Sequence, residues 1–419
     1  MWGDIAIAFL LAFITAFMMT PYSIKLAKKV GAVDVPKDNR RMHHKAIPKL
    51  GGIAVITGFV VSCIYLLITM SIEDASKLNL FGKPQYGVKL IGFFVGVLIL
   101  GITCFIDDTK GIKPLTKLTG QLLAAIAVVA SGVRIVDTIP IFESAVVNEI
   151  ISSILTILWI IGITNAINLM DGLDGLSSGI TMISCISLLI IFSLNNSPLI
   201  AIIMITALGG ALCGFLPYNF NPAKTFIGDT GSNFLGYTLS VVSILGVAKT
   251  YTAAVIILPV IVLGLPIFDT LYAILRRLHN GKSIKAIFQA DKGHLHHRLV
   301  RKGFSHKQSV YILYGISATF GMFAVILFES GIIKAISFAL MVIAVIALGY
   351  KSFSNLHGEE GSSYVCSNCK YIYNPKVGNE TAGIDPNTEF YDLPSDWRCP
   401  VCGERKDMFT PRDWYLTCI

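Results

Sequence analysis

Carboxylate and amide side chains gather just after two long apolar runs of this sequence. Asp107 and Asp108 end one run, and Asn168, Asp171 and Asp174 follow another. Adjacent carboxylates at a membrane interface are costly unless they bind a cation or a partner, although plain solvation is the alternative interpretation. Carboxylate and amide oxygens are the hard ligands that Mg²⁺ prefers. These residues therefore predict a divalent-cation site.

A second polar stretch, residues 217–232, combines groups suited to a phosphorylated ligand. Lys224 suits a phosphate, Asp229 a metal ion and Phe226 a stacked base. Stretches rich in Asn, Pro, Gly and Asp are also ordinary turns, so both interpretations stay open at this point.

Three histidines and an arginine form a third cluster at His294, His296, His297 and Arg298. Zinc is the less favoured ligand because no cysteine accompanies them. Arg and His suit an anion better. With the acids and the lysine they indicate a metal-assisted reaction of a phosphorylated substrate. The sequence has no GxxxxGK[ST] motif and no kinase signature, which argues against ATP as the donor.

The composition is that of a membrane protein. Of the 419 residues, 54% are hydrophobic and only 14% are charged, whereas a soluble domain is about a quarter charged. This excludes an ordinary water-soluble enzyme and a disordered chain. The net charge of +8 divides into +12 for the membrane part and −4 for residues 358–419, and the basic charge of the membrane part is assigned to cytoplasmic loops near anionic lipid. No basic run is interleaved with aromatic residues, so nucleic acid is not an expected partner.

Eleven apolar runs predict an all-α polytopic membrane protein with about eleven transmembrane helices. They lie at about 4–20, 51–70, 88–106, 118–136, 150–167, 177–194, 198–216, 232–248, 251–269, 309–328 and 332–349. The loops at 21–50 and 270–308 are basic, so the positive-inside rule puts the N-terminus outside and the C-terminus in the cytoplasm. Every polar cluster then falls in a cytoplasmic loop, which predicts an active site on the cytoplasmic face.

Five ordered motifs carry a resemblance over about residues 1–350. They are RRMHHKAIPKLGG (40–52), DDTKG (107–111), NAINLMDGLDGL (165–176), NPAKTFIGDTGS (221–232) and HLHHRL (294–299). This part of the chain resembles the polyprenyl-phosphate N-acetylhexosamine-1-phosphate transferase family. The resemblance implies transfer of a sugar 1-phosphate from a UDP-sugar to undecaprenyl phosphate, with release of UMP, in the bacterial plasma membrane.

Within that family the histidine motif resembles the GlcNAc-1-phosphate branch, which starts teichoic acid, O-antigen or related polymers. The MurNAc-pentapeptide branch typically has three consecutive histidines, which Leu295 interrupts here. UDP-GlcNAc is therefore the expected donor, with UDP-MurNAc-pentapeptide as the alternative. A homodimer is a further family expectation.

The resemblance also implies roles for individual residues. Asn168 and Asp229 are the expected ligands of Mg²⁺, with Mn²⁺ as an alternative ion. Asp107 and Asp108 are the expected catalytic residues, handling the lipid phosphate or helping to orient the metal, and whether either acts as a base stays open. The implied substrate-binding residues are Lys45, Lys117, Asp171, Asp174, Asn221, Lys224, Phe226, His294, His296, His297 and Arg298.

The C-terminal part is a separate object, reached through a polar linker at 351–363. Cys366 and Cys369 form one CxxC pair, and Cys399 and Cys402 form another. In the reducing cytosol this spacing predicts a four-thiolate metal site and not disulfides. The spacing alone leaves zinc and iron open.

Aromatic residues between and after these pairs make residues 364–411 resemble rubredoxin, so a domain at 364–413 is expected. The resemblance implies one iron, short β-strands and single-electron transfer. Lys370 and Asn387 stand where that family has glycine. A tail at 414–419 leaves Cys418 as a free thiol. The module is interpreted as a regulatory or electron-transfer fusion with a redox partner, or as an engineered folding aid.

Two other classes are weaker hypotheses. A rubredoxin-linked membrane redox protein needs cofactor ligands inside the bilayer, yet the histidines fall in loops or the linker. A transporter predicts ionisable residues near the middle of the spans, which these runs largely lack.

Overall fold

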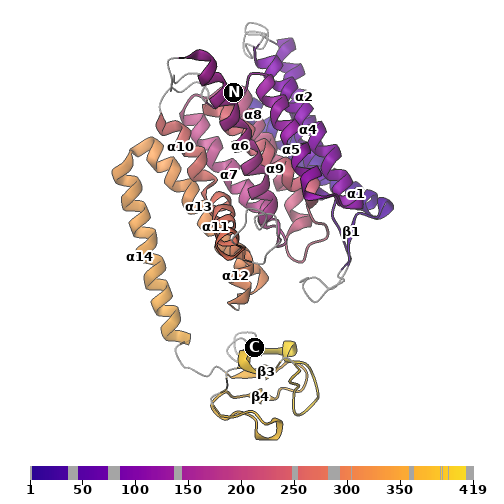
Figure 1. The fold of residues 1–419 in the computed structure, drawn as a ribbon, viewed down its shortest axis with the longest axis vertical. Coiled ribbons are helices and arrows are strands. Elements are labelled where there is room, and N and C mark those ends of the chain that lie inside the picture. The colour runs from indigo at the N-terminus through magenta and orange to yellow at the C-terminus, as the bar shows by residue number, and fades with distance from the viewer. Residues whose placement is uncertain are drawn as a thin grey trace. The chain divides into compact units, whose positions relative to one another are not determined.

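The computed structural model describes residues 2–35, 46–73, 85–135, 144–247, 253–281, 293–302, 304–357 and 363–411, apart from 387, 389 and 395. Among the predicted site residues only Lys45 lies outside these ranges, and so do Asn387 and Cys418 of the C-terminal part. The chain divides into two compact units, Met1–Phe338 and Ala339–Ile419 (Figure 1).

The first unit is a bundle of helices (Figure 1). In chain order they are α1 (Trp2–Val30), α2 (Gly51–Glu73), α4 (Gln85–Lys110), α5 (Pro114–Ala130), α6 (Ala145–Met170), α7 (Leu176–Leu194), α8 (Leu199–Asn219), α9 (Gly228–Val247), α10 (Ala253–Val262), α11 (Gly264–Gly281), α12 (Leu295–Arg301) and α13 (His306–Ser330). One antiparallel pair of short strands, β1 (Val33–Asp34) and β2 (Ile47–Pro48), joins α1 to α2. Helix α14 (Ile332–His357) continues from the bundle into the second unit.

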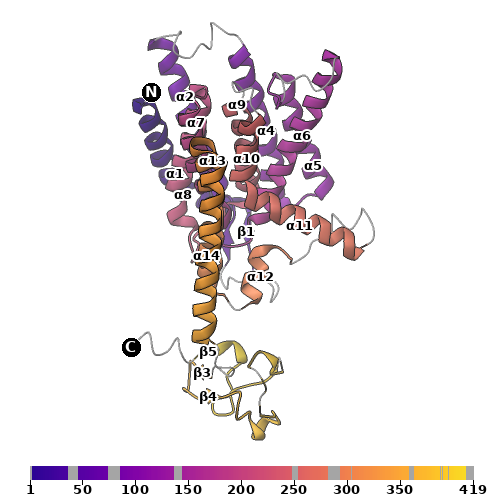
Figure 2. The ribbon, with the colours of Figure 1, turned by 90° about the vertical axis from the view of Figure 1, so that its left-hand side faces the viewer.

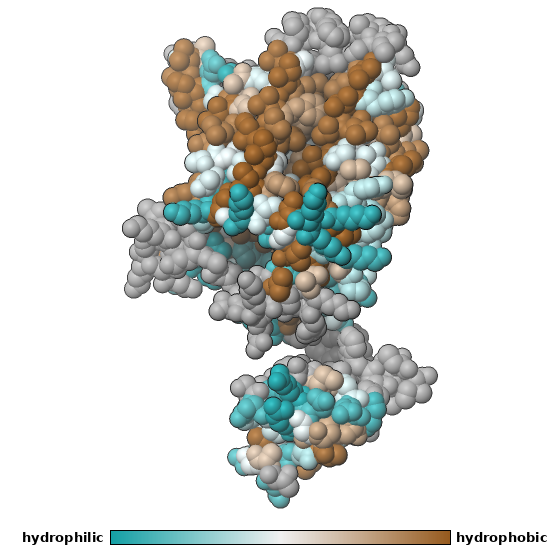
Figure 3. Space-filling view, turned by 90° about the vertical axis from the view of Figure 1, so that its right-hand side faces the viewer, coloured by the Kyte–Doolittle hydropathy of each residue, from teal (hydrophilic) through white to brown (hydrophobic). Residues whose placement is uncertain are grey.

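The surface of the bundle is that of a protein embedded in lipid. Among the described residues, seven helices are long and apolar enough to cross a membrane: α1, α2, α4, α6, α7, α8 and α13. Ile91 and Leu98 on α4 are 65% and 63% exposed, which water would penalise and lipid does not. Figure 3 shows a broad hydrophobic surface bordered by hydrophilic side chains. The chain is therefore a multi-pass membrane protein.

Helix α9 lies at the centre of the bundle and contacts α2, α4, α6, α7 and α8. Small residues permit this close packing, because a Cβ at Gly236 would lie 2.6 Å from the Cα of Thr164 on α6. The buried hydroxyl of Tyr237 donates a hydrogen bond of 2.9 Å to the carbonyl oxygen of Phe93 on α4. The first turn of α9 is thereby held at one depth relative to α4 and α6.

The apolar run at 251–269, expected as one helix, forms two helices that meet at Leu263. Pro266 has no N–H group, so it cannot donate to the carbonyl oxygen of Val262, and the helical ladder is interrupted there. The break lets α11 extend sideways from the other helices, with α12 beside it (Figure 2).

The second unit contains a three-stranded antiparallel sheet in the order β4–β3–β5, formed by β3 (Tyr364–Cys366), β4 (Ile372–Tyr373) and β5 (Phe409–Pro411). Its small core is built from aromatic side chains: Tyr364, Tyr373, Phe390, Trp397 and Phe409. Short 3₁₀ turns cover Glu380–Ala382, Phe390–Asp392 and Lys406–Met408. Helix α14 continues to His357, so the first half of the expected linker is helical.

Candidate active site

The ammonium group of Lys117 on α5 is surrounded by oxygen atoms from three other helices. Its Nζ lies 3.3 Å from Oδ2 of Asp107 at the end of α4, and it donates a 3.1 Å hydrogen bond to Oδ1 of Asn168 on α6. It also donates a hydrogen bond to Oδ1 of Asp229 in the first turn of α9. Four residues predicted separately from the sequence thus form one cluster.

Within this cluster Asp229 is the acid most open to a ligand. Its side chain is 34% exposed, against 14% for Asp107 and 16% for Lys117. The amide nitrogen of Asn168 donates to Oδ1 of Asp229 at 2.7 Å and to Oγ of Ser232 at 2.8 Å. The amide nitrogen of Asn168 therefore orients Asp229, and its amide oxygen faces the ammonium group of Lys117.

Asp108 has a different environment from its neighbour Asp107. It is 3% exposed, and its Oδ1 accepts the backbone N–H of Asp229 at 3.0 Å. Its Oδ2 accepts the backbone N–H and the hydroxyl of Thr230, at 2.8 Å and 2.7 Å. A carboxylate at this place satisfies unpaired N–H groups of the first turn and complements the helix dipole. Asp108 thereby fixes the start of α9, which carries Asp229.

Polar side chains inside the bundle support this first turn. The amide nitrogen of Asn233 donates to the carbonyl oxygen of Asp229 at 2.8 Å, and its Oδ1 accepts from Gln121 at 2.7 Å. Gln121 in turn accepts from the amide of Asn165 at 2.8 Å. Gln121 and Asn233 were not predicted from the sequence. The available signal was a polar residue inside an apolar run, which is costly without a partner.

The turn between α6 and α7 carries Asp171 and Asp174. Oδ1 of Asp171 accepts the hydroxyl of Ser177 at 2.6 Å. Partial desolvation by the surrounding protein raises the pKa of Asp171 to about 7. Oδ2 of Asp174 accepts the amide of Asn221 at 2.8 Å and the backbone N–H of Ala223 at 3.0 Å. Asp174 therefore ties the 221–223 segment to this turn.

The predicted histidine cluster lies on α12 and at its start. His296 is 2% exposed and packs so closely on the turn after α6 that a Cβ at Gly172 would collide with its Nε2. Burial, with the nearby His297 and His294, lowers the pKa of His296 to about 3, so its imidazole is neutral at physiological pH. The close packing of His296 on Gly172 places the histidine motif against the Asp171–Asp174 turn.

Several residues of this region had no place in the sequence analysis. They are Asp269, Tyr272 and His306. Asp269 of α11 pairs with His294, and the ring centre of Tyr272 lies 5.4 Å from the guanidinium of Arg298. His306 accepts the backbone N–H of Asp174 at 2.8 Å. Asp269 stands inside an apolar run, which was the signal available for it.

The remaining predicted substrate residues lie on the segment before α9. Lys224 is exposed, and its Nζ lies 5.8 Å from the ring centre of Tyr218. The backbone of Phe226 pairs with the end of β2 and the start of α2: its N–H donates to the carbonyl oxygen of Pro48 at 2.8 Å, and its carbonyl oxygen accepts from the N–H of Gly51 at 3.0 Å. The RRMHHKAIPKLGG and NPAKTFIGDTGS motifs therefore meet in space.

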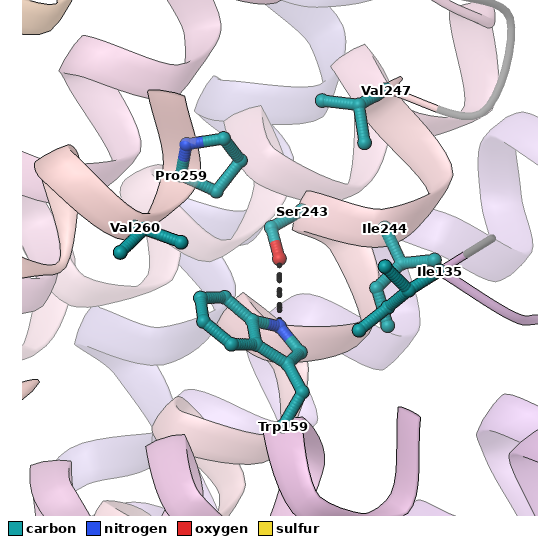
Figure 4. Close-up of a pocket in the computed structure, with 7 residues that line it drawn as sticks. All are labelled: Ile135, Trp159, Ser243, Ile244, Val247, Pro259 and Val260. Atoms are coloured by element: carbon teal, nitrogen blue, oxygen red, sulfur yellow. Dashed lines mark hydrogen bonds between the residues drawn. The ribbon is translucent and has the colours of Figure 1, made fainter. Parts of the chain in front are cut away.

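A separate apolar pocket of about 40 Å³ lies between α6, α9 and α10 (Figure 4). Its lining residues are Ile135, Trp159, Ser243, Ile244, Val247, Pro259 and Val260. The indole N–H of Trp159 donates to the hydroxyl of Ser243 at 3.2 Å. None of the predicted site residues lines this pocket.

The second unit contains a cluster of four thiols. The sulfur atoms of Cys366, Cys369, Cys399 and Cys402 all lie within 4.8 Å of one another. Sγ of Cys366 lies 3.6 Å from that of Cys402, and Sγ of Cys369 lies 3.4 Å from that of Cys399. Metal–sulfur bonds of about 2.3 Å in a tetrahedron give edges of similar length. The four thiols therefore fit a single iron or similar ion.

Comparisons with known proteins agree with both parts. The family described as "Glycosyl transferase family 4" matches residues 90–247, and the family described as "Rubredoxin" matches residues 363–409. A "Probable undecaprenyl-phosphate N-acetylglucosaminyl 1-phosphate transferase" of Bacillus subtilis is 36% identical over 324 residues, covering 77% of this chain and 85% of the relative.

Two further relatives cover the chain in different ways. A "Decaprenyl-phosphate N-acetylglucosaminephosphotransferase" of Mycolicibacterium smegmatis is 33% identical over 375 residues, covering 82% of this chain and 87% of the relative. A "High molecular weight rubredoxin" of Moorella thermoacetica is 52% identical over 46 residues, covering 11% of this chain and 20% of that protein.

Proposed function

The chain belongs to glycosyl transferase family 4 and ends in a rubredoxin domain, and from this premise we propose its reaction. It transfers N-acetylglucosamine 1-phosphate from UDP-GlcNAc to undecaprenyl phosphate and releases UMP. The observation that carries the proposal is the cluster in which Lys117 faces Asp107, Asn168 and Asp229. The names of the relatives supply the substrate class.

The donor set of this cluster suits Mg²⁺. Asp229 and Asn168 present a carboxylate and an amide oxygen toward one cationic group, and hard oxygen ligands of this kind are those that Mg²⁺ takes. In our proposal these two residues hold the ion, with Asp107 beside them. A bound Mg²⁺ would neutralise charge on the diphosphate of the donor.

The residues of the chain then have distinct tasks. The lipid phosphate oxygen attacks the phosphorus that carries the sugar, and the bond from that phosphorus to the bridging oxygen breaks, so that UMP leaves. Lys117 provides positive charge for the phosphates, as phosphoryl transfer requires. A lipid phosphate is largely ionised near neutral pH, so Asp107 need not remove a proton from it. Asp108 acts by holding Asp229 in place.

The remaining predicted residues surround the donor. We assign Asp171, Asp174, Asn221 and Phe226 to the uridine side of the site. We assign His294, His296, His297 and Arg298 to the sugar and diphosphate. The contacts between His296 and Gly172, and between Asp174 and Asn221, support one continuous donor site. Lys45 and Lys224 complete the proposal as phosphate contacts.

The topology belongs to the same proposal. The chain has about eleven spans in this proposal. The basic last turn of α1, with Lys28 and Lys29, supports an outer N-terminus and an active site on the cytoplasmic face. We propose residues 1–350 as the transferase, 351–363 as the connection, 364–413 as an iron-binding rubredoxin domain with a redox partner and 414–419 as a tail. We also propose that the protein forms a homodimer and acts in teichoic acid or O-antigen synthesis.

UMP release by purified full-length protein tests the reaction. With Mg²⁺ and undecaprenyl phosphate, we expect UMP from UDP-GlcNAc and none from UDP-MurNAc-pentapeptide. EDTA and Asp229→Ala should each abolish it, whereas Asp396→Asn in the rubredoxin domain, which also removes one carboxylate, should leave it unchanged. UMP from the pentapeptide donor alone would assign the other branch, and silence with both donors would reject the proposal.

Metal analysis and visible absorbance test the rubredoxin domain in the same preparation. We expect one iron per chain and a ferric-thiolate spectrum that dithionite bleaches. Cys402→Ser should lose the spectrum while UMP release continues. One zinc per chain with no visible band would reject the iron assignment.

A further inference from the structure

Asp269 on α11 is a buried carboxylate outside every predicted motif. It is 1% exposed, and both of its oxygen atoms are used. Oδ2 lies 2.8 Å from Nδ1 of His294, and Oδ1 accepts the backbone N–H of Leu295 at 2.8 Å. A buried carboxylate is costly unless it is paired and hydrogen-bonded, so a polar group kept at this depth holds its partners firmly.

The partners of His294 define its tautomer. Its Nε2 lies 3.5 Å from Nη2 of Arg277, and an arginine can only donate. The carboxylate of Asp269 can only accept, so Nδ1 carries the proton of that contact. The ring is fixed between a carboxylate and a guanidinium, which sets both its tautomer and its rotation.

The face of α11 that carries Asp269 also contacts α12 and the segment just before it. Asp269, Tyr272 and Arg276 are spaced so that they share one face of the helix. Arg276 donates to the carbonyl oxygen of Gly293, and the ring of Tyr272 lies 5.4 Å from the guanidinium carbon of Arg298. Asp269 thus belongs to a row of contacts that begins just before α12 and runs along it.

Movement of α12 would be transmitted directly to the donor site. His294 is the residue that precedes the first turn of α12, and His296 packs on Gly172 with its Nδ1 buried and without a hydrogen-bond partner in the described part of the chain. A rotation at His294 would shift His296, His297 and Arg298 relative to the Asp171–Asp174 turn.

We propose that Asp269 is a positioning residue of the transferase site. It fixes His294 and the start of α12, and through them it places His296, His297 and Arg298 against the sugar and diphosphate of the donor. The inference rests on the proposed function, which assigns those residues to the donor.

Asp269→Asn in the full-length protein tests this inference. The amide keeps the shape and can accept from Leu295, but it cannot also accept the Nδ1 proton of His294. We expect the KM for UDP-GlcNAc to rise about 10–100-fold, the range typical of losing a group that orients a ligand, while the KM for undecaprenyl phosphate stays within about 2-fold. His294→Gln should give a similar effect, and the double variant should be no worse than either single variant.

Several controls separate the outcomes. Asp4→Asn, which removes a carboxyl group in the first turn of α1, should leave both KM values unchanged. Wild-type protein that releases no UMP would reject the proposed function itself. Active Asp269→Asn protein with unchanged KM values and only a lower melting temperature would overturn the positioning role. If Asp269→Asn does not fold, Asp269→Ser, which also removes the carboxylate that faces His294, decides the question by the same two KM values.

Discussion

The carboxylate of Asp108 accepts the backbone N–H of Asp229 at 3.0 Å, so one acid of the site holds another in place. Neighbouring acids thus have separate partners: Asp107 faces the Lys117 ammonium at 3.3 Å, and Asp108 binds the first turn of α9. Adjacent carboxylates at a helix end need not act as a pair.

Asp108→Ala should destabilise the protein and reduce its activity together. Removing a capping side chain costs about 0.5–2 kcal/mol, and it leaves the N–H groups of Asp229 and Thr230 without their acceptor. Thermal unfolding in detergent and the kcat for UMP release measure the two effects. Asp108→Asn, which keeps one acceptor oxygen, should lie between wild type and Asp108→Ala. A wild-type melting temperature for Asp108→Ala would contradict this role.

Lys117→Met should bind divalent cations more tightly while turning over more slowly. The ammonium of Lys117 competes for Asp229 and Asn168, so its removal leaves their oxygens to the metal ion. Without the positive charge that Lys117 provides for the phosphates, kcat should fall by about 100-fold or more. Mn²⁺ binding to the free protein, followed by electron paramagnetic resonance, checks the first effect. Weaker Mn²⁺ binding would refute the competition, and Lys117→Arg is the control that keeps the charge.

Gly172→Ala should impair donor binding because the new Cβ collides with Nε2 of His296. A misplacement near 1 Å costs up to about 100-fold in rate in well-oriented sites. Kinetics with varied UDP-GlcNAc measure the effect. Gly162→Ala in α6, where a Cβ meets no atom within 4 Å, should behave like wild type. Equal kinetics for the two variants would show that His296 does not depend on this contact.

The stability of the protein should carry a pH dependence from Asp171. Its pKa is raised from 3.8 to about 7 by burial, so the folded state binds the proton more tightly than the unfolded state. This contribution is complete below about pH 4 and is lost as the pH rises to about 7. Asp171→Asn removes it, so the melting temperature of the variant minus that of wild type should grow between pH 5 and pH 8. A constant difference would exclude the shifted pKa.

Lys370→Gly should stabilise the thiol site of the C-terminal unit. Lys370 has a φ of +64°, as Gly403 after the other CxxC pair has +74°. A side chain in this left-handed conformation costs roughly 1–2 kcal/mol, which glycine avoids. The temperature at which the iron-thiolate absorbance is lost should therefore rise for Lys370→Gly and fall for Gly403→Ala. No difference between Lys370→Gly and wild type would mean that the strain is absorbed locally.

Local features of the chain were enough to predict the class of protein and the types of side chain expected in its site. Apolar runs predicted a helical membrane protein, because helix length and hydropathy are local properties of the chain. The types of residue at Asp107, Asn168 and Asp229 predicted a cation site, because oxygen ligands define the ions that they suit. The spacing of the cysteine pairs predicted the thiol cluster, because each pair is held by a short turn.

Which of these groups face each other depends on how the helices pack. Lys117 and Asp229 meet because α5 and α9 pack in the same bundle, and no local pattern contains that contact. The separate environment of Asp108, the break at Leu263 and the pairing of Asp269 with His294 likewise depend on where helices distant in sequence lie. Hydropathy reports whether a residue is buried, whereas its partner is chosen by the packing of the whole bundle.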